Sequence, residues 1–339
     1  MTLRCGLVGA GAIARSYVDV FAGVDGAAIV AVADPDPRAA DALAEAVRGT
    51  SFPSQRSMLE DAALDAVLIC APPNVHHELV LAAIDEGCHV LCEKPLALTG
   101  TAAREMLVAA DQAGVHFAMA TKFRFVDDVI RARQVVESGI LGDLIQIENV
   151  FASRVDMSRR WNSDPAIAGG GVLIDNGTHS VDIARYFLGP IVEVLAVEGR
   201  RVQQLPVEDT VRVQVRTADG LLGSIDLSWS YDSVNESYLE VYGSYGTVKV
   251  GWHESCYRQA SSTEWVPFGR GYDKISCMRS QVERFCRVLR GEGTPAITPD
   301  DMLASVLVIE AAYASLETGE WTPVEKPLVA PGGAGEQVA

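Results

Sequence analysis

The segment LRCGLVGAGAIA, residues 3–14, decides the fold of the N-terminal part of the chain. Leu3–Val8 is a short apolar run that predicts a buried strand, and Ala12–Phe21 continues with helical spacing. The turn between them matches G-x-G-x-x-G/A, in which glycines let the backbone bend tightly and approach a pyrophosphate. The free amides of the following helix favour an anion. We therefore predict a dinucleotide site formed by Gly9, Gly11, Ala12 and Ile13.

Strands and helices continue to alternate up to about residue 122. Further strands are predicted at Ala28–Ala33, Val67–Cys70, His89–Cys92 and Val115–Ala120. Helices are predicted at Arg38–Val47, Val75–Glu86 and Thr101–Ala113. This alternation implies right-handed βαβ units, and continuous apolar strands fit a sheet that is covered on both faces. The prediction is an α/β fold whose first domain, residues 1–122, is a doubly wound parallel sheet.

Asp34 ends the second predicted strand, about 20 residues after the glycine turn, where such folds place an acid that binds the adenosine ribose. A carboxylate there repels a 2′-phosphate, which favours NAD. Arg38 lies one turn further on and could instead pair with that phosphate, so NADP stays open. A second interpretation makes Asp34 the N-cap of the helix that starts near Pro35.

Beyond residue 122 the pattern changes to long alternating segments, such as Thr210–Thr217 and Leu222–Ser230, with helices before and after them. Alternation marks strands that have one packed face. We predict a second domain over residues 123–328 and a flexible tail over residues 329–339. In the last helix, Thr298 is the expected N-cap and Gly319 the expected C-terminal glycine.

Composition limits the class of protein. The 339 residues carry a formal net charge of −17, which disfavours general binding to nucleic acid or anionic lipid. No apolar stretch is long enough to span a bilayer, and the N-terminus lacks a leader pattern. The seven cysteines show no disulfide spacing, so we expect a reduced, cytoplasmic protein. No metal site is expected, because Cys88 and Cys92 at the two ends of one strand would lie about 13 Å apart.

Two segments carry candidate catalytic residues. Glu93-Lys94-Pro95 follows a strand at the sheet edge where doubly wound folds bind ligands, although a surface lysine is the commoner case. In the second segment three glycines, residues 169–171, precede a predicted helix on which Asp175 and His179 are four residues apart. A carboxylate beside an imidazole suits a general acid/base, although such pairs also occur on plain surfaces.

Taken in order, these motifs resemble those of the Gfo/Idh/MocA oxidoreductases, the relatives of glucose–fructose oxidoreductase and inositol dehydrogenase. The resemblance covers nearly the whole chain. It implies an N-terminal Rossmann domain for NAD(P) and a C-terminal α+β domain with an open, mostly antiparallel sheet that serves dimer or tetramer formation. It also implies that Lys94, Asp175 and His179 are catalytic. Cofactor contacts are implied for Ala71, Pro72, Pro73, His76, Glu93 and Lys94.

The stretch from Lys122 to Arg160 contains seven basic and six acidic residues, unlike the acidic remainder of the chain. We predict that this stretch helps to line the substrate site, the alternative being a solvated loop of mixed charge. The predicted substrate contacts are Lys122, Arg124, Arg160, Trp161, Asp175 and His179.

The function predicted on these grounds is an NAD(P)-dependent dehydrogenase or reductase that acts on a secondary alcohol or ketone of a sugar, cyclitol or nucleotide-linked sugar. One alternative keeps the same site but uses transient oxidation to cleave or eliminate a glycoside. Another is a non-catalytic, nucleotide-sensing regulatory protein.

Overall fold

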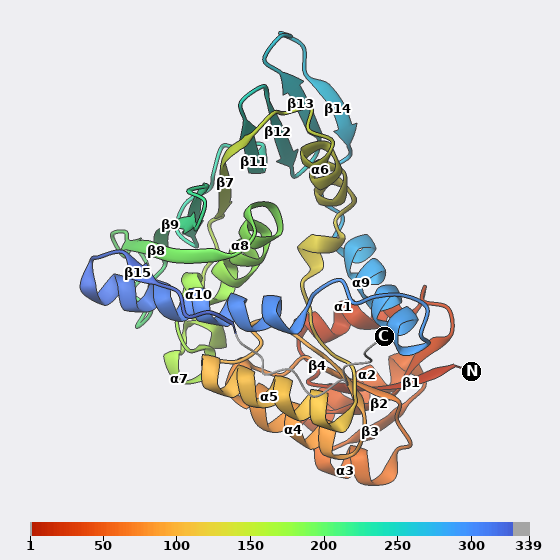
Figure 1. The fold of residues 1–339 in the computed structure, drawn as a ribbon. Helices are drawn as coiled ribbons and strands as arrows, with labels where there is room; N and C mark the ends of the chain where they lie inside the picture. The colour runs from red at the N-terminus through yellow and green to blue at the C-terminus, as the bar shows by residue number, and fades with distance from the viewer. Residues whose placement is uncertain (1, 328–339) are drawn as a thin grey trace, which may run out of the picture. The chain divides into compact units, whose positions relative to one another are not determined.

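The computed structural model describes residues 2–327, which form two compact units (Figure 1). The first comprises residues 2–120, 279–304 and 327, and the second comprises Thr121–Met278 and Ser305–Lys326. The segment 279–304 thus groups with the first unit, whereas each predicted domain is one continuous stretch of the chain. The domain limits, 1–122 and 123–328, stay a prediction, and the predicted tail over 329–339 lies outside the described residues.

The first unit is a six-stranded parallel sheet in the order β3-β2-β1-β4-β5-β6. Its strands are β1 (Leu3–Val8), β2 (Ala27–Ala33), β3 (Thr50–Phe52), β4 (Ala66–Ile69), β5 (His89–Cys92) and β6 (Phe117–Met119). Leu7, Leu68 and Val90 are fully buried, as expected for strands covered on both faces. The predicted doubly wound sheet is confirmed, and the sequence pattern missed only the short β3 and the helix after it.

Helices cover both faces of this sheet (Figure 1). Those that belong to it are α1 (Ala12–Phe21), α2 (Pro37–Val47), α3 (Gln55–Asp61), α4 (His76–Asp85) and α5 (Gly100–Ala113). Helix α9 (Lys274–Leu289) joins the unit from Arg279 onward, and beyond its end Arg290 donates a 2.6 Å hydrogen bond to the carbonyl of Gly26. The strand order reverses between β1 and β4, so the segments that follow these two strands flank the switch point where such folds bind ligands.

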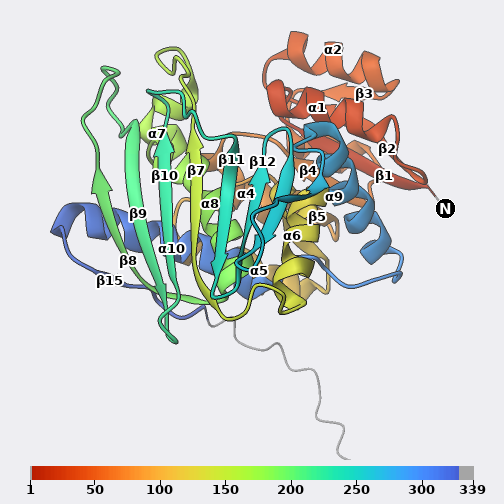
Figure 2. The same ribbon diagram turned by 90° about the horizontal axis from the view of Figure 1, so that it is seen from above.

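The second unit is built on a nine-stranded sheet in the order β14-β13-β12-β11-β7-β10-β9-β8-β15, in which β7 and β10 are parallel and the other pairs antiparallel (Figure 2). The strands are β7 (Leu144–Ala152), β8 (Ile191–Glu198), β9 (Thr210–Thr217), β10 (Leu222–Ser228), β11 (Ser237–Gly243), β12 (Gly246–Gly251), β13 (Ser255–Gln259), β14 (Val266–Gly269) and β15 (Thr322–Pro323). The predicted mostly antiparallel sheet is confirmed.

One face of this second sheet packs against helix α8 (Val172–Leu188), while α6 (Asp127–Glu137) lies against β12 and β14. Helix α10 (Pro299–Thr318) belongs to this unit from Ser305 onward, and the short α7 (Pro165–Ala168) lies wholly within it. Along β9 the buried Val211, Val213 and Val215 alternate with the exposed Arg212 and Arg216. The face opposite α8 therefore carries polar side chains. Within residues 2–327, no helix has both the length and the apolar character that crossing a bilayer requires.

Candidate functional site

The glycine turn after β1 has the backbone that the sequence motif requires. Gly9 has φ +90°, a region that glycine occupies easily, and its amide donates a 2.8 Å hydrogen bond to the carbonyl of Ala33. A Cβ atom on Gly9 would lie only 2.8 Å from the carbonyl carbon and oxygen of Cys70. The residue is therefore a glycine because the loops after β1 and β4 pass so close together.

Gly11 is the N-cap of α1 and differs from Gly9 in what surrounds it. Apart from the backbone around Gly11 itself, no atom of the described residues lies within 4 Å of the place where its Cβ would be, and no side chain caps the helix. The first turn of α1 also contains no acidic residue. Helix-start amides that lack a capping side chain bind an anionic group. This open, uncapped turn fits the pyrophosphate of a dinucleotide.

Replacing Gly11 by valine is expected to raise the Kd for NAD by at least about tenfold, because the side chain would fill the space that the pyrophosphate needs. The melting temperature should stay close to that of the unchanged protein, since the side chain enters open space. The matched variant Gly9→Ala should instead lose roughly 1–3 kcal/mol of stability, because it combines a left-handed backbone with a steric clash. Fluorescence titration and thermal unfolding measure the two effects, and equal destabilisation by both variants would contradict the assignment.

Asp34 holds the glycine turn by hydrogen bonds to two backbone amides. Its Oδ2 accepts from the amide of Ala10 at 2.7 Å, and its Oδ1 accepts from the amide of Asp36 at 2.8 Å. The N-cap of α2 is Asp36, whose Oδ1 accepts from the amide of Arg38 at 3.0 Å. The alternative in which Asp34 caps a helix that starts near Pro35 is therefore wrong, because Asp36 occupies the N-cap and the helix begins at Pro37. The Arg38 side chain is exposed.

His76 joins the two loops that follow β4 and β5. Its ring is 1% exposed, with Nδ1 2.9 Å from the carbonyl oxygen of Pro95 and Nε2 2.9 Å from that of Ala71. Burial lowers the pKa of His76, and these carbonyl groups act in the opposite direction. Both ring nitrogens face backbone oxygens inside the unit, and a cofactor contact by His76 stays a prediction. Its role is to hold the loop of Ala71, Pro72 and Pro73 against the segment that carries Lys94.

Glu93 holds the same segment from the side of α1. Its Oε1 accepts from the hydroxyl of Tyr17 at 2.8 Å, and its Oε2 accepts from the backbone amide of Lys94 at 3.2 Å. Gln281 of α9 donates to the Tyr17 hydroxyl at 3.1 Å. Burial, followed by the charge of Glu93, raises the pKa of Tyr17. The half-buried Lys94 is thus placed by a fixed backbone, and a cofactor contact by Glu93 stays a prediction.

Asp175 and His179 lie one turn apart on α8, as the sequence spacing predicts, and both are half-buried. The ring of His179 meets that of Phe123 edge-on, with the centroids 5.1 Å apart. Phe123 stacks on Tyr272 at 5.3 Å, and the Nζ of Lys122 lies 5.5 Å and 5.8 Å from the centroids of these two rings. The aromatic residues were missed at the sequence level, since they come from distant segments. Lys122 and His179 thus share the ring of Phe123 as a neighbour.

Arg124, a predicted substrate contact, forms a buried ion pair within the second unit. Its guanidinium pairs with the carboxylate of Asp182 on α8, at 2.8–3.0 Å, and the side chains are only 7% and 3% exposed. The same group lies 5.3 Å from the ring centroid of Tyr186. Arg124 therefore links α8 to the segment after β6, and a substrate contact by Arg124 stays a prediction.

Arg160 and Trp161 lie on the segment between β7 and α7 and are both exposed, Trp161 by 43%. Their position agrees with either predicted interpretation, a substrate loop or a solvated loop. Lys94 belongs to the first unit, whereas Asp175 and His179 belong to the second. The meeting of all three in one site stays a prediction. Within residues 2–327, no group of three or more His, Cys, Asp or Glu is arranged to hold a metal ion.

Comparison with known proteins agrees with the glycine turn and the two sheets. Residues 3–121 match the family model described as "Oxidoreductase family, NAD-binding Rossmann fold", and residues 129–249 match the GFO/IDH/MocA C-terminal domain. The fold and the turn define an NAD-binding oxidoreductase. The chain belongs to the Gfo/Idh/MocA oxidoreductase family.

Named relatives cover almost the full length of the chain. Inositol 2-dehydrogenase 2 of Saccharopolyspora erythraea is 28% identical over 334 residues, which are 96% of this chain and 96% of that protein. The 1,5-anhydro-D-fructose reductase of Ensifer adhaerens is 29% identical over 338 residues, 96% of this chain and 99% of that one. The structure of levoglucosan dehydrogenase in complex with NADH and levoglucosan aligns with a TM-score of 0.89 at 23% identity, covering 96% and 100% of the two chains, and shows the shared fold.

Proposed function

We propose that this chain oxidises a secondary hydroxyl group of a sugar, cyclitol or nucleotide-linked sugar to the ketone and catalyses the reverse reduction. The observation that carries the proposal is the pair of Asp175 and His179, one turn apart on α8 in the substrate-domain half of an NAD-binding oxidoreductase. The named relatives act on inositol, an anhydro-fructose and levoglucosan, all of which are polyhydroxylated rings. When bound, the nicotinamide dinucleotide supplies the hydride acceptor or donor for this reaction.

The chain's own residues would handle the proton and the oxygen. His179 takes the proton of the reacting hydroxyl during oxidation and returns it during reduction. Asp175, on the same side of α8, orients the imidazole or holds a neighbouring hydroxyl of the substrate. The ammonium group of Lys94 donates a hydrogen bond to the reacting oxygen and stabilises the negative charge that develops there. In the first unit, the turn at Gly9–Gly11 and Asp34 would hold the pyrophosphate and the ribose.

Three further side chains are proposed to select the substrate. Lys122 lies beside the rings of Phe123 and Tyr272, of which the first contacts His179, and a cation there can hold hydroxyl or anionic groups. Trp161 offers an exposed ring face for stacking on a sugar, and Arg160 offers a guanidinium for hydroxyl groups or a phosphate. Because Lys122 and Arg160 belong to the charge-balanced stretch, a negatively charged substrate is compatible with an acidic protein.

A spectrophotometric screen at 340 nm tests the proposal. NAD and NADP are each combined with inositols, aldoses, anhydro-sugars, glycosides and nucleotide sugars, in both reaction directions. We expect cofactor-dependent turnover of at least one polyhydroxylated ring. Turnover without added cofactor, with NAD retained by the purified protein, would replace the proposal by redox-assisted glycoside cleavage. Cofactor binding without hydride transfer across the whole panel would favour a nucleotide-sensing protein.

NAD is proposed as the physiological cofactor, and the charge of Asp34 is the reason. Replacing Asp34 by asparagine is expected to improve kcat/KM with NADP relative to NAD by about tenfold or more, because repulsion of the 2′-phosphate is removed. Asparagine has one carbonyl oxygen, so it retains one of the two hydrogen bonds to Ala10 and Asp36. The matched control Asp36→Asn removes a neighbouring charge but keeps the helix cap, and should leave the preference unchanged. An unchanged NAD/NADP ratio in Asp34→Asn would contradict the assignment.

We also propose that copies of this chain assemble into a dimer or tetramer through the open face of the nine-stranded sheet. That face carries cross-strand ion pairs such as Arg212 with Asp226, and exposed apolar side chains such as Leu222. Light scattering on the purified protein should give two or four times the mass of one chain, and a monomer would contradict this.

The cytoplasm is the proposed location, supported by seven cysteines that are all free thiols, six of them buried.

A further inference from the structure

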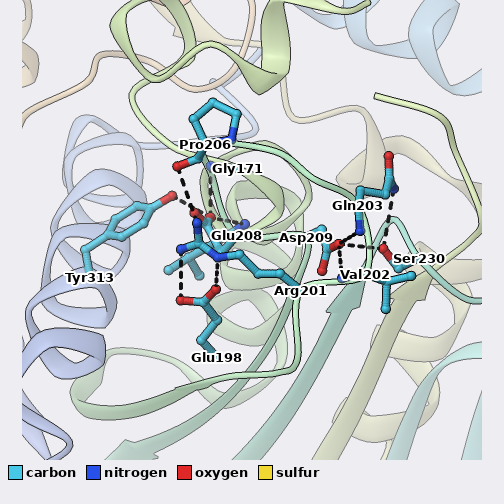
Figure 3. Close-up of polar contacts among 11 residues, drawn as sticks. Gly171, Glu198, Arg201, Val202, Gln203, Pro206, Glu208, Asp209, Ser230 and Tyr313 are labelled. Atoms are coloured by element: carbon cyan, nitrogen blue, oxygen red, sulfur yellow. Dashed lines mark hydrogen bonds and ion pairs between the residues drawn. The ribbon is translucent and has the colours of Figure 1, made fainter. Parts of the chain in front are cut away.

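Two adjacent carboxylates directly before β9 have no part in the chemistry proposed above. Glu208 is 5% exposed and Asp209 is fully buried. Figure 3 shows that the two side chains are bonded to different parts of the unit. Burying a charged group is costly unless hydrogen bonds compensate for the lost water. The partners of these two groups therefore show what each of them holds.

Glu208 binds the start of α8. Its Oε1 accepts hydrogen bonds from the amides of Gly171 at 2.9 Å and Leu173 at 3.1 Å, and from the Tyr313 hydroxyl at 2.9 Å (Figure 3). Its backbone carbonyl accepts from the amide of Val172 at 3.0 Å. The amides in the first turn of a helix have no partner within the helix, and a negative charge there is favourable. One residue thus binds three successive amides of the helix that carries Asp175 and His179.

The glycines before α8 are explained by the same contact. A Cβ atom on Gly171 would overlap the carbonyl oxygen of Glu208, and one on Gly170 would overlap the hydroxyl of Tyr313. The close approach of helix, carboxylate and phenol therefore requires both glycines. Burial raises the pKa of Glu208, while its hydrogen bonds to the amides and to Tyr313 act in the opposite direction.

Asp209 binds a different segment. Its Oδ2 accepts from the amides of Val202 at 2.9 Å and Gln203 at 2.8 Å, and from the hydroxyl of Ser230 at 2.8 Å (Figure 3). These bonds to Asp209 hold the backbone of Gln203, whose side-chain amide group reaches the segment after β7. It donates to the carbonyl of Val155 at 2.9 Å and accepts from the amide of Met157 at 3.1 Å. This second path ends on the segment that continues to Arg160 and Trp161.

We propose that Glu208 and Asp209 are positioning residues with separate tasks. Glu208, together with Tyr313, fixes the start of α8 and hence the acid/base pair. Asp209, acting through Gln203, fixes the loop that presents Arg160 and Trp161 to the substrate. This inference deepens the proposed function and rests on it for its kinetic consequence. The first residue then governs the rate of the chemical step, and the second governs substrate binding.

The kinetic test compares two pairs of variants with myo-inositol, or with levoglucosan if that is turned over faster. Glu208→Gln and Tyr313→Phe should lower kcat about tenfold or more with KM changed less than about twofold, because misplaced catalytic groups slow the chemical step. Asp209→Asn and Gln203→Ala should raise KM about tenfold with kcat changed less than about twofold. Glu198→Gln is the matched control, since Glu198 pairs with Arg201 beside the same cluster and reaches neither segment. If both pairs change the same kinetic parameter, the division of tasks is wrong.

Amide hydrogen exchange provides a readout that does not depend on activity. In Glu208→Gln and Tyr313→Phe, exchange should accelerate in peptides that cover residues 169–176 and remain unchanged in those that cover 153–161. The reverse pattern is expected for Asp209→Asn and Gln203→Ala. Tyr313→Phe removes a single hydroxyl group and serves if Glu208→Gln fails to fold. If this exchange pattern were found without turnover of any substrate, the proposed function would be refuted. Glu208 and Asp209 would still be shown to hold their two segments. The inference would be overturned if every variant accelerated exchange in both segments, or if no variant accelerated exchange in either segment.

Discussion

Replacing His179 by alanine is expected to lower kcat about 10²- to 10⁴-fold, which is the usual contribution of a positioned acid/base group. The reason is that an imidazole can both take up and release a proton, and His179 lies one turn from Asp175 on α8. The affinity for NAD should not change, because the glycine turn and Asp34 lie in the other unit. Stopped-flow or steady-state kinetics with the substrate found by the screen, together with fluorescence titration of NAD, measures both quantities.

Stability controls keep this result interpretable. The alanine variant loses the edge-on contact with Phe123, which is worth about 0.5–1.5 kcal/mol, so only a modest drop in melting temperature is expected. Asp175→Asn is the companion variant, and it should reduce kcat and shift the pH profile if Asp175 orients the imidazole. If His179→Ala kept full turnover, the acid/base assignment would be wrong whatever the effect on stability.

Replacing Arg124 by methionine is expected to destabilise the second unit by about 3–5 kcal/mol, the cost of leaving one member of a buried ion pair without its partner. Both side chains of the Arg124–Asp182 pair are almost fully buried, so solvent screens the loss very little. Chemical unfolding followed by tryptophan fluorescence measures the change.

The double variant Arg124→Met/Asp182→Leu is the control for this second prediction. Because it removes both charges, its stability should return to within about 1–2 kcal/mol of that of the unchanged protein. A single Arg124→Met variant that kept its stability but raised KM would show instead that Arg124 contacts the substrate, as the sequence analysis predicts.

The regular elements with strong local patterns could be predicted from the sequence. Leu3–Val8, Ala12–Phe21, His89–Cys92 and Thr210–Thr217 end where the structure ends them, because apolar runs and glycines delimit them. Strands β3, β13, β14 and β15 were missed. They are short edge strands or lie near an edge, and they form because a neighbouring strand offers hydrogen bonds, a contact that no local pattern encodes.

For the candidate site, the sequence predicts which helix or loop carries a residue better than it predicts what the side chain contacts. The spacing of Asp175 and His179 places both on one side of a helix wherever that helix packs. In contrast, the partner of Arg124 lies 58 residues away and that of His76 is a backbone oxygen 19 residues away. The sequence shows two adjacent acids, Glu208 and Asp209, directly before a predicted strand. Only the fold shows that both are buried and that they bind different segments.

The tie made by His76 has a consequence for variation and for design. The ring nitrogens of His76 lie 2.9 Å from the carbonyl oxygens of Ala71 and Pro95, groups that every amino acid possesses, and the neutral ring donates its one N–H to one of the two. Sequence changes at the intervening loop positions Pro72, Asn74 and Val75 can therefore alter the surface offered to a ligand while the spacing of the two loops is kept. A library randomised at these positions with His76 retained should yield many folded members, whereas one that also randomises His76 should yield few.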